Sequence, residues 1–250
     1  MKNKHIERFY RGVKLTRAAG AATDVVDPPV TYTQVFYKEY PRFPSVELPD
    51  VTPCGEFDTL LEGRHSERSF ADIPVSLDEL PRILSTCRIV DRVRDPEKRT
   101  YPSAGARFPI EIYPIVFNVD GLERGAYHYD MPRHRLEILL EQDLRDRETE
   151  IVSPYLSNTA AALVLTAVLA RSEVKYGNKA YPYSLIEAGH IGQNIQLACA
   201  KYDIGCCPIG GFVNDAVSEI LDLTEDEIPL YVFGTGKSKL DDDEATRDSG

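Results

Sequence analysis

A lysine and a tyrosine stand side by side in the segment KYGNKAYPYS, where Lys175 and Tyr176 follow an apolar stretch of the chain. A lysine works as a base when its surroundings favour the neutral amine, and a tyrosine hydroxyl can donate or accept a proton. The pair could therefore move a proton to or from a bound substrate. The alternative is a lysine in a surface loop beside a packed tyrosine.

The segment GRHSERSF gathers groups that bind anions: Arg64, His65, Ser66 and Arg68. Arginine offers paired donors to a phosphate or to carbonyl-like oxygens, and serine adds a hydroxyl donor. This composition predicts an anion or heterocycle site. A solvated helix end with paired surface charges would look the same in sequence.

Two loops of small residues could complete such a site. YPSAGARFP (101–109) opens directly into an apolar stretch, and CCPIGGF (206–212) contains adjacent glycines. Loops of this kind let backbone amides approach a flat or anionic ligand closely. Each segment is equally consistent with an ordinary tight turn.

The charge of the chain narrows the possible partners. Its 250 residues carry 29 basic and 40 acidic side chains, for a net charge of −11. This argues against a general affinity for nucleic acid or acidic lipid, which needs a basic surface, but a pocket for one phosphate needs few donors. No apolar run approaches the roughly 20 residues of a membrane span, and the N-terminus lacks the apolar region of a secretory signal. We expect a cytoplasmic protein.

The cysteines predict neither a disulfide framework nor a metal site. There are five of them, two adjacent, and no C-x-x-C pair occurs. We expect free thiols, with Cys206 and Cys207 as small buried hydrophobic residues rather than a redox pair.

Periodic patterns predict the strands that must hold these segments. Apolar, β-branched runs indicate strands at 110–119, 162–170 and 228–236, and GAYHYD with RLEILL indicates a hairpin. Pro114 suggests that the first of these strands is an edge strand or contains a bulge.

Helices are expected after Ser76, which has capping-box spacing to Glu79, and around 143–152, 184–201 and 214–222. Pro81 makes the length of the first helix uncertain, and Asn214 is the expected N-cap of the last. Strands and helices do not alternate regularly, so we predict an α+β domain. No G-x-G-x-x-G follows a strand, so a Rossmann nicotinamide site is not indicated.

The helix expected at 184–201 carries two stripes. Ala188, Ile191, Ile195 and Ala198 form an apolar face, and Glu187, His190 and Asn194 lie on another. A helix with few charges and small residues is typical of a buried interface, which suggests a dimer. Residues 1–50 contain five prolines and are interpreted as an arm over a neighbouring surface, with some disorder at its start. Residues 51–237 are interpreted as the folded domain and 238–250 as an acidic mobile tail.

Taken in order, these segments resemble the nitroreductase superfamily, and more narrowly the SagB/ThcOx-type dehydrogenases that oxidise azoline rings in ribosomal peptides. The resemblance runs from about Leu48 to Lys237. The matching segments are RHSER, PSAGARFP, GAYHYD, KYGNKAY, EAGHIGQN and PIGGF.

The resemblance implies a nitroreductase-like fold, with a mostly antiparallel central sheet flanked by helices, in an intertwined homodimer. It also implies that the folded domain at 51–237 is an FMN-binding domain, with two FMN sites in the dimer, each built from both chains. The residues implied at FMN are Arg64, His65, Ser66 and Arg68 at the phosphate, ribityl chain and pyrimidine edge, Ser103 from the other subunit at the isoalloxazine, Ile209, Gly210 and Gly211 beside the ring, and Lys237 as a second phosphate donor.

The same resemblance implies that Lys175 and Tyr176 form the acid–base pair of an azoline oxidation. This reaction removes a proton from Cα and a hydride from Cβ, and dioxygen is the expected oxidant that restores the flavin. Which of the two residues takes the proton does not follow from the sequence. The implied substrate is a thiazoline or oxazoline in a modified peptide or related heterocycle, and a cyclodehydratase complex is a candidate partner.

Two departures from the family pattern concern the substrate side: Pro182 stands where an arginine is usual, and the chain has no tryptophan. Two other functions therefore stay open. One is an NAD(P)H-dependent reductase of nitro compounds, quinones or dehydroamino acids. The other is a flavin-free scaffold subunit of a peptide-modifying complex.

Overall fold

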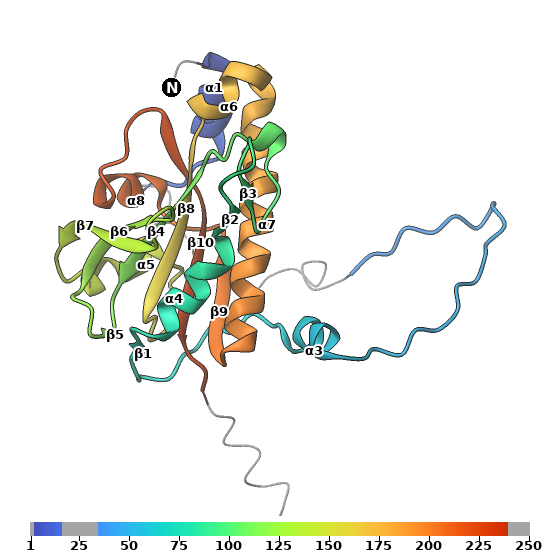
Figure 1. Cartoon of the computed structure of the whole chain (residues 1–250), viewed down its shortest axis with the longest axis horizontal. Coiled ribbons are helices and arrows are strands. Elements are labelled where there is room, and N and C mark those ends of the chain that lie inside the picture. The colour runs from blue at the N-terminus through green and yellow to red at the C-terminus, as the bar shows by residue number, and fades with distance from the viewer. Residues whose placement is uncertain (1–2, 17–34, 240–250) are drawn as a thin grey trace, which may run out of the picture.

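The computed structural model describes residues 3–16 and 35–239 of the chain, so the predictions for the middle of the N-terminal arm and for most of the acidic tail lie outside the described residues. A six-stranded sheet in the order β7-β6-β4-β8-β10-β9 forms the centre, and every neighbouring pair is antiparallel. Figure 1 shows the sheet between α7 on one side and α8 on the other.

The strands of this sheet are β4 (Ile110–Val116), β6 (Gly125–Asp130), β7 (Arg135–Glu141), β8 (Ala161–Val168), β9 (Ile204–Ile209) and β10 (Glu227–Lys237). The described helices are α1 (Lys4–Val13), α3 (Glu56–Gly63), α4 (Glu79–Leu84), α5 (Glu148–Ile151), α6 (Ala170–Tyr176), α7 (Ala180–Lys201) and α8 (Asn214–Ile220). Short pairs β1 (Val75–Ser76) with β5 (Val119–Asp120) and β2 (Ile89–Asp91) with β3 (Lys98–Arg99) lie outside the main sheet. The α+β, antiparallel architecture is confirmed.

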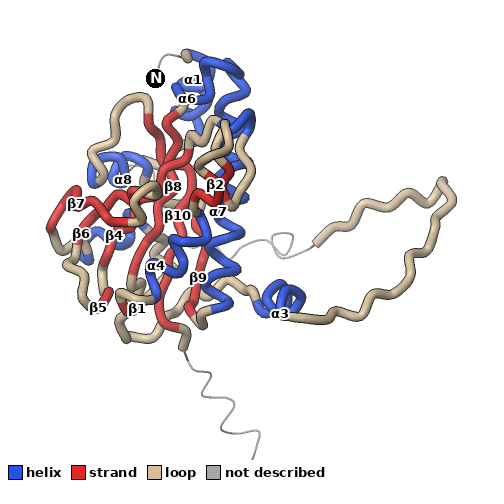
Figure 2. Tube along the Cα trace, viewed as in Figure 1, coloured by secondary structure: helices blue, strands red, loops and turns tan. Residues whose placement is uncertain are grey.

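The core has two layers because successive strand residues point to opposite faces of the sheet. On β8, Leu163 and Leu165 pack in the cluster that contains α4 and α7, whereas Ala162 and Val164 pack in the cluster that contains α5 and α8. The run ALVLTAVLA is buried on both faces, which explains why it is apolar without alternation. Figure 2 shows helices on both sides of the sheet.

The prediction from Pro114 was wrong, because β4 lies inside the sheet between β6 and β8. Pro114 pairs with Leu163 of β8, whereas the β6 partners of β4 begin only at Ile115. The ladder on the β6 side thus leaves out the residue that has no N–H to donate.

The predicted helices exist with different ends. The backbone N–H of Ser76 donates to Glu79 Oε2 at 2.8 Å, as the capping pattern predicts, but α4 starts at Glu79. Pro81 then falls in the first turn, where no backbone N–H needs a helical partner. The expected helix at 143–152 is a 3₁₀ turn at Arg145–Arg147 followed by α5.

Asn214 is not the N-cap of α8; Val213 is. The Asn214 side chain instead accepts the N–H of Leu15 at 2.9 Å and donates to the Tyr10 hydroxyl at 3.2 Å. These long-range contacts hold the segment that follows α1 against α8, and local sequence gives no sign of them.

Residues 35–55 extend away from the domain as a long loop (Figure 1). Their large apolar side chains are exposed to solvent; Val46, for example, is 88% exposed. The exposed members are Val35, Phe36, Tyr37, Tyr40, Phe43, Val46, Leu48 and Val51. No helix within the described residues is long and apolar enough to cross a membrane.

Candidate active site

Lys175 and Tyr176 occupy the last turn of α6 rather than a surface loop, which was the alternative considered for them. Gly177 follows with φ of 52°, a left-handed conformation that ends the helix and that glycine adopts without strain. The Lys175 side chain is exposed and Tyr176 is half-buried. The Tyr176 ring packs edge-on against Tyr183 of α7 at 5.1 Å between ring centres, which fixes its orientation.

Both reactive groups of the pair converge on the small-residue loop. A Cβ atom added to Gly105 would lie 2.7 Å from Lys175 Nζ and closer still to the Tyr176 hydroxyl oxygen. Lys175 Nζ also lies 5.5 Å from the centre of the Tyr176 ring. The structure therefore brings together two predicted elements, the Lys-Tyr pair and the Pro-Ser-Ala-Gly loop, at one point of a single chain.

The loop itself has a fixed, partly strained shape. The Ser103 hydroxyl accepts the N–H of Phe108 at 2.9 Å, and the backbone turns tightly from Ala104 to Ala106. Ala106 and Phe108 have φ of 51° and 47°, values that residues other than glycine adopt at a cost of about 1 kcal/mol or more. Strain of this kind is held by the surrounding structure and is common at ligand sites.

A buried glutamate of α7 contacts Ser103 of this loop. Glu187 of α7 is 2% exposed, and its Oε1 has no hydrogen-bond partner among residues 3–16 and 35–239. Burial raises the pKa of its carboxyl to about 7, although the Ser103 hydroxyl, the charge of Arg99 and the N–H of Ile110 act in the opposite direction. Sequence reasoning placed Glu187 on a polar stripe and did not single it out.

The predicted anion-binding segment lies at the other end of α7. Arg64 Nη1 donates to Gln196 Oε1 at 3.4 Å, and the segment after it runs along β9, the edge strand of the sheet, to the end of β10. The N–H of Glu67 donates to the carbonyl of Cys206 at 3.0 Å, and the N–H of Ala71 donates to the carbonyl of Lys237 at 2.8 Å. These bonds place the Arg64–Arg68 segment beside β9 and near Lys237 at the end of β10, whereas Ile209 lies at the opposite end of β9, where it pairs with Val232.

The remaining predicted residues differ in how available they are. Lys237 Nζ is paired with Glu79, and the His65 side chain is exposed with Nδ1 3.0 Å from the carbonyl of Gly63. Ile209 is buried in the core, so its backbone rather than its side chain can meet a ligand. Gly210 and Gly211 are exposed, and a Cβ added to either would meet nothing within 4 Å. That open backbone fits a flat ring.

One chain does not bring the two sets of residues together. Arg64 contacts Gln196, whereas Lys175 and Tyr176 precede the first residue of α7, Ala180. The Tyr176 ring packs against Tyr183, so at a rise of 1.5 Å per residue the helix from 183 to 196 separates the pair from the Arg64 contact by about 20 Å.

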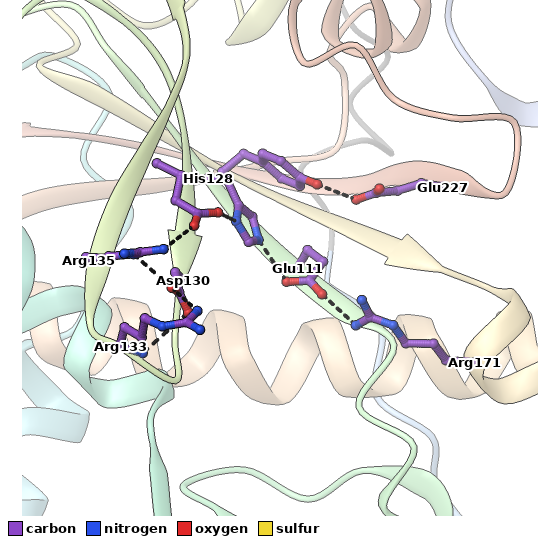
Figure 3. Close-up of polar contacts among 9 residues, drawn as sticks. Glu111, His128, Asp130, Arg133, Arg135, Arg171 and Glu227 are labelled. Atoms are coloured by element: carbon purple, nitrogen blue, oxygen red, sulfur yellow. Dashed lines mark hydrogen bonds and ion pairs between the residues drawn. The ribbon is translucent and has the colours of Figure 1, made fainter.

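A further polar cluster, which sequence reasoning missed, joins β4, β6 and β7 (Figure 3). His128 Nε2 lies 3.1 Å from Glu111 Oε2, and His128 Nδ1 lies 3.1 Å from Glu137 Oε2. The hydrogen bond to Glu111 is the main reason that the pKa of His128 is raised. Arg171 of α6 pairs with Glu111 at 2.5 Å, so the cluster also anchors the helix that carries Lys175 and Tyr176.

Four of the cysteines, Cys87, Cys199, Cys206 and Cys207, are buried and free, and Cys54 is exposed and free. Burial raises the pKa of the Cys87 thiol to about 12. The expectation that Cys206 and Cys207 act as small buried hydrophobic residues is consistent with these positions.

Comparisons with known proteins agree with this architecture. The chain is 30% identical over 194 residues to MJ1384 of Methanocaldococcus jannaschii, a protein named for the nitroreductases; the match covers 77% of this chain and 96% of the relative. It is 31% identical over 108 residues to the trifolitoxin-processing protein TfxB of Rhizobium leguminosarum bv. trifolii, covering 40% of this chain and 29% of TfxB.

Among solved structures, the fold matches a chain of the Escherichia coli microcin synthetase McbBCD complex with truncated pro-MccB17 bound. The TM-score is 0.77 at 21% identity, and the match covers 94% of this chain and 92% of the other. The model of the nitroreductase family matches residues 61–237, which include the anion-binding segment, the small-residue loops and the Lys-Tyr pair. The chain therefore belongs to the nitroreductase family, whose proteins typically bind FMN.

Proposed function

We propose that this protein is an FMN-dependent dehydrogenase that oxidises azoline rings of a modified peptide to azoles. The observation that carries the proposal is the convergence of Lys175 and Tyr176 on Gly105, beside Ser103. A proton-transfer pair on α6, held against a loop that would adjoin the ring of a flavin, is what such an oxidation needs and what a simple reductase, which takes protons from water, does not need.

The similarities favour the same class of substrate. TfxB is named for the processing of trifolitoxin, and the microcin synthetase complex holds a truncated pro-MccB17. Both are proteins of peptide modification by name. We extend that role to this chain, with a cyclodehydratase complex as its candidate partner.

The proposed reaction converts an azoline and an oxidised flavin into an azole and a reduced flavin. FMN supplies a hydride acceptor for the hydrogen on Cβ when it is bound. Lys175 or Tyr176 takes the proton from Cα, and Gly105 lets both groups stand close to the ring because it has no side chain. Dioxygen is the proposed final oxidant.

The proposed contacts to FMN are inferred from the hydrogen-bond donors of the Arg64–Arg68 segment and of Lys237. Arg64, Arg68 and Lys237 are cations for the phosphate, and the hydroxyl of Ser66 and the ring of His65 are suited to the ribityl chain. The open backbone at Ile209–Gly211 would lie along the ring. Lys237 must then leave Glu79 or share its charge between the carboxylate and the phosphate.

We further propose that two copies of the chain form the site. The Arg64 cluster of one chain would meet the loop of Ser103 and the Lys-Tyr pair of the other, because about 20 Å of α7 separates the Arg64 contact from the pair within a chain. The exposed face of α7 supports this arrangement: Leu185 and Ile186 are 42% and 57% exposed, and none of the exposed residues between Ile186 and Lys201 is an acid, a lysine or an arginine, because Glu187 is buried. An uncharged exposed helix face is typical of an interface.

The test begins with the visible spectrum of the purified protein and the mass of any released cofactor. Peaks of oxidised flavin, with FMN released at about one per chain, would support the cofactor assignment. A thiazoline peptide is then added under air, and loss of two hydrogens is followed by mass spectrometry. A flavin that is bleached rapidly by NAD(P)H, with no azole formed, would instead favour a reductase. A colourless protein that cannot be reconstituted with FMN would leave the scaffold role.

A further inference from the structure

A groove rich in arginine opens next to the Lys-Tyr pair. It has a volume of about 570 Å³ and lies between the segment 92–97 and the segment 106–108, with Arg171 of α6 at its edge. Five arginines but only two acidic residues line it. The five are Arg92, Arg94, Arg99, Arg107 and Arg171; the two acids are Asp95 and Glu97. In a chain with net charge −11, this local excess of positive charge stands out from the rest of the surface.

Two of these arginines are free to bind a ligand. Arg99 is committed to Glu97 and to the Tyr101 hydroxyl, and Arg171 is committed to Glu111. An Nη group of Arg92 donates to the carbonyl of Pro132. By contrast, neither Arg94 nor Arg107 makes an ion pair with any residue in 3–16 or 35–239. Arg107 uses its Nε to donate to the carbonyl of Arg171 at 2.7 Å, and the residue is exposed.

The groove is continuous with the candidate active site. Ala106, which lines it, directly follows Gly105, where Lys175 and Tyr176 converge. The Arg107 side chain donates to the carbonyl of Arg171, the second residue of α6. This bond fixes the groove to the same helix that carries the pair. If one segment of a peptide lay in the groove, the next residue of that peptide would therefore lie at the Lys-Tyr pair.

From this geometry we infer that the groove binds an acidic segment of the peptide substrate, next to the ring that is oxidised. This inference rests on the proposed function and names the kind of peptide it acts on. Carboxylates suit a pair of guanidinium groups because each accepts two parallel hydrogen bonds. The acidic surface elsewhere repels such a peptide, so attraction confined to the groove would also set the direction in which the peptide lies.

The experiment compares two fluorescently labelled thiazoline peptides on the FMN-loaded protein. One has aspartates beside the ring, and the other has asparagines at the same positions. Fluorescence anisotropy gives binding, and mass spectrometry gives azole formation. We expect the acidic peptide to bind at least ~10-fold more tightly at low salt, with most of that difference lost at about 0.3 M salt because the exposed charges are screened.

Charge-reversal variants then locate the effect. Arg94→Glu together with Arg107→Glu should remove the preference for the acidic peptide, and Arg94→Glu alone should weaken it while retaining the bond from Arg107 to α6. The control is Arg11→Glu with Arg82→Glu, which changes the net charge equally at exposed sites away from the groove. Retained FMN and an unchanged circular dichroism spectrum show that each variant is folded.

The outcomes separate this inference from the proposed function. Azole formation with equal binding and equal kcat/KM for both peptides would refute the binding of acidic peptide in the groove but not the proposed dehydrogenase function. Charge-selective binding that is lost in the groove variants, without azole from either peptide, would support the groove and overturn the dehydrogenase. An equal loss of binding in the control variant, or a groove that binds NADPH in place of the acidic peptide, would refute the inference.

Discussion

Lys175 lies against Gly105 across the candidate active site: a Cβ atom added to Gly105 would stand 2.7 Å from its ammonium nitrogen. Real side-chain atoms do not approach that closely, and the Tyr176 hydroxyl is nearer still. The glycine is therefore required both by its φ of 58° and by the position of the pair.

Gly105→Ala should displace Lys175 and Tyr176 and lower azole formation by ~10- to 100-fold, the scale of a misplaced acid–base group. FMN should stay bound. Gly121→Ala is the matched control: Gly121 also has a positive φ, of 77°, but a Cβ there would meet Leu77 at an ordinary 3.6 Å. Turnover assays and thermal melts on both variants separate backbone strain from the clash. Equal activities in the two variants would count against the close approach as a feature of catalysis.

Lys175→Ala and Tyr176→Phe should each cut azoline oxidation by at least ~10²-fold without loss of FMN, because each removes one of the two groups that can take the Cα proton. Single-turnover reduction of the bound flavin by a thiazoline peptide measures the step directly. Tyr183→Phe is the control, since it keeps the ring that packs against Tyr176 and removes only a hydroxyl. Near-normal flavin reduction in both pair variants would remove the pair from the mechanism.

Arg64→Ala should release FMN, because the proposed phosphate cluster would lose its half-buried guanidinium. Gln196→Ala should weaken FMN binding less, since Gln196 orients Arg64 through one hydrogen bond of 3.4 Å. Dialysis followed by measurement of the flavin absorbance ranks the two variants. Arg82→Ala, an exposed arginine of α4, serves as the control. An Arg64→Ala protein that remained fully flavinated would show that the phosphate lies elsewhere.

The strands were predictable because the burial of each strand is visible in its own residues. The runs 110–119 and 162–170 are apolar and β-branched, and they form β4 and β8 nearly as expected. Helix α6 escaped prediction because ARSEVKY is short and has no regular apolar stripe. It is held instead by contacts from elsewhere, such as Arg171 with Glu111.

The candidate site was predictable as motifs but not as an arrangement. The proximity of Gly105 to Lys175 joins residues that are far apart in the sequence, and local patterns cannot report it. Glu187 was visible as one member of a polar stripe with His190, yet Glu187 is buried and His190 is exposed. That difference arises because the loop of Ser103 covers only one of them.

Glu187→Gln should stabilise the protein above neutral pH. The folded-state pKa of Glu187 is about 7, above the ordinary value of 4.5, so its contribution to stability is fully present below pH 4.5 and is lost as the pH rises through 7. The amide carries no charge to bury, and the gain at pH 8 should approach about 3 kcal/mol, since each tenfold change in proton affinity corresponds to about 1.4 kcal/mol.

Urea unfolding at pH 5 and pH 8 checks this expectation, with Glu123→Gln, a change at an exposed site, as the control. The difference in free energy of unfolding between the Glu187 variant and the parent should grow with pH. A difference that stays constant between the two pH values would mean that Glu187 is already neutralised by a partner throughout.

His128→Gln should destabilise the protein in acid and have less effect in base. The carboxylates of Glu111 and Glu137 raise the pKa of His128, so its contribution to stability is fully present below the ordinary pKa of 6.5 and is lost as the pH rises through the higher folded-state value. The other groups that face it are the Tyr113 ring, at 5.1 Å, and Arg171 beyond Glu111. At pH 6 the loss should be about 1.5–3 kcal/mol, the usual contribution of hydrogen bonds to a charged group.

Thermal melts at pH 6 and pH 9 provide the measurement, with His5→Gln on the exposed side of α1 as the control. Because Glu111 also pairs with Arg171 on α6, the loss of His128 should leave that ion pair and the Lys-Tyr pair in place. Azole formation per folded molecule should accordingly match the parent protein at both pH values. A fall in activity larger than the fall in folded fraction would instead show that the cluster in Figure 3 positions α6 for catalysis.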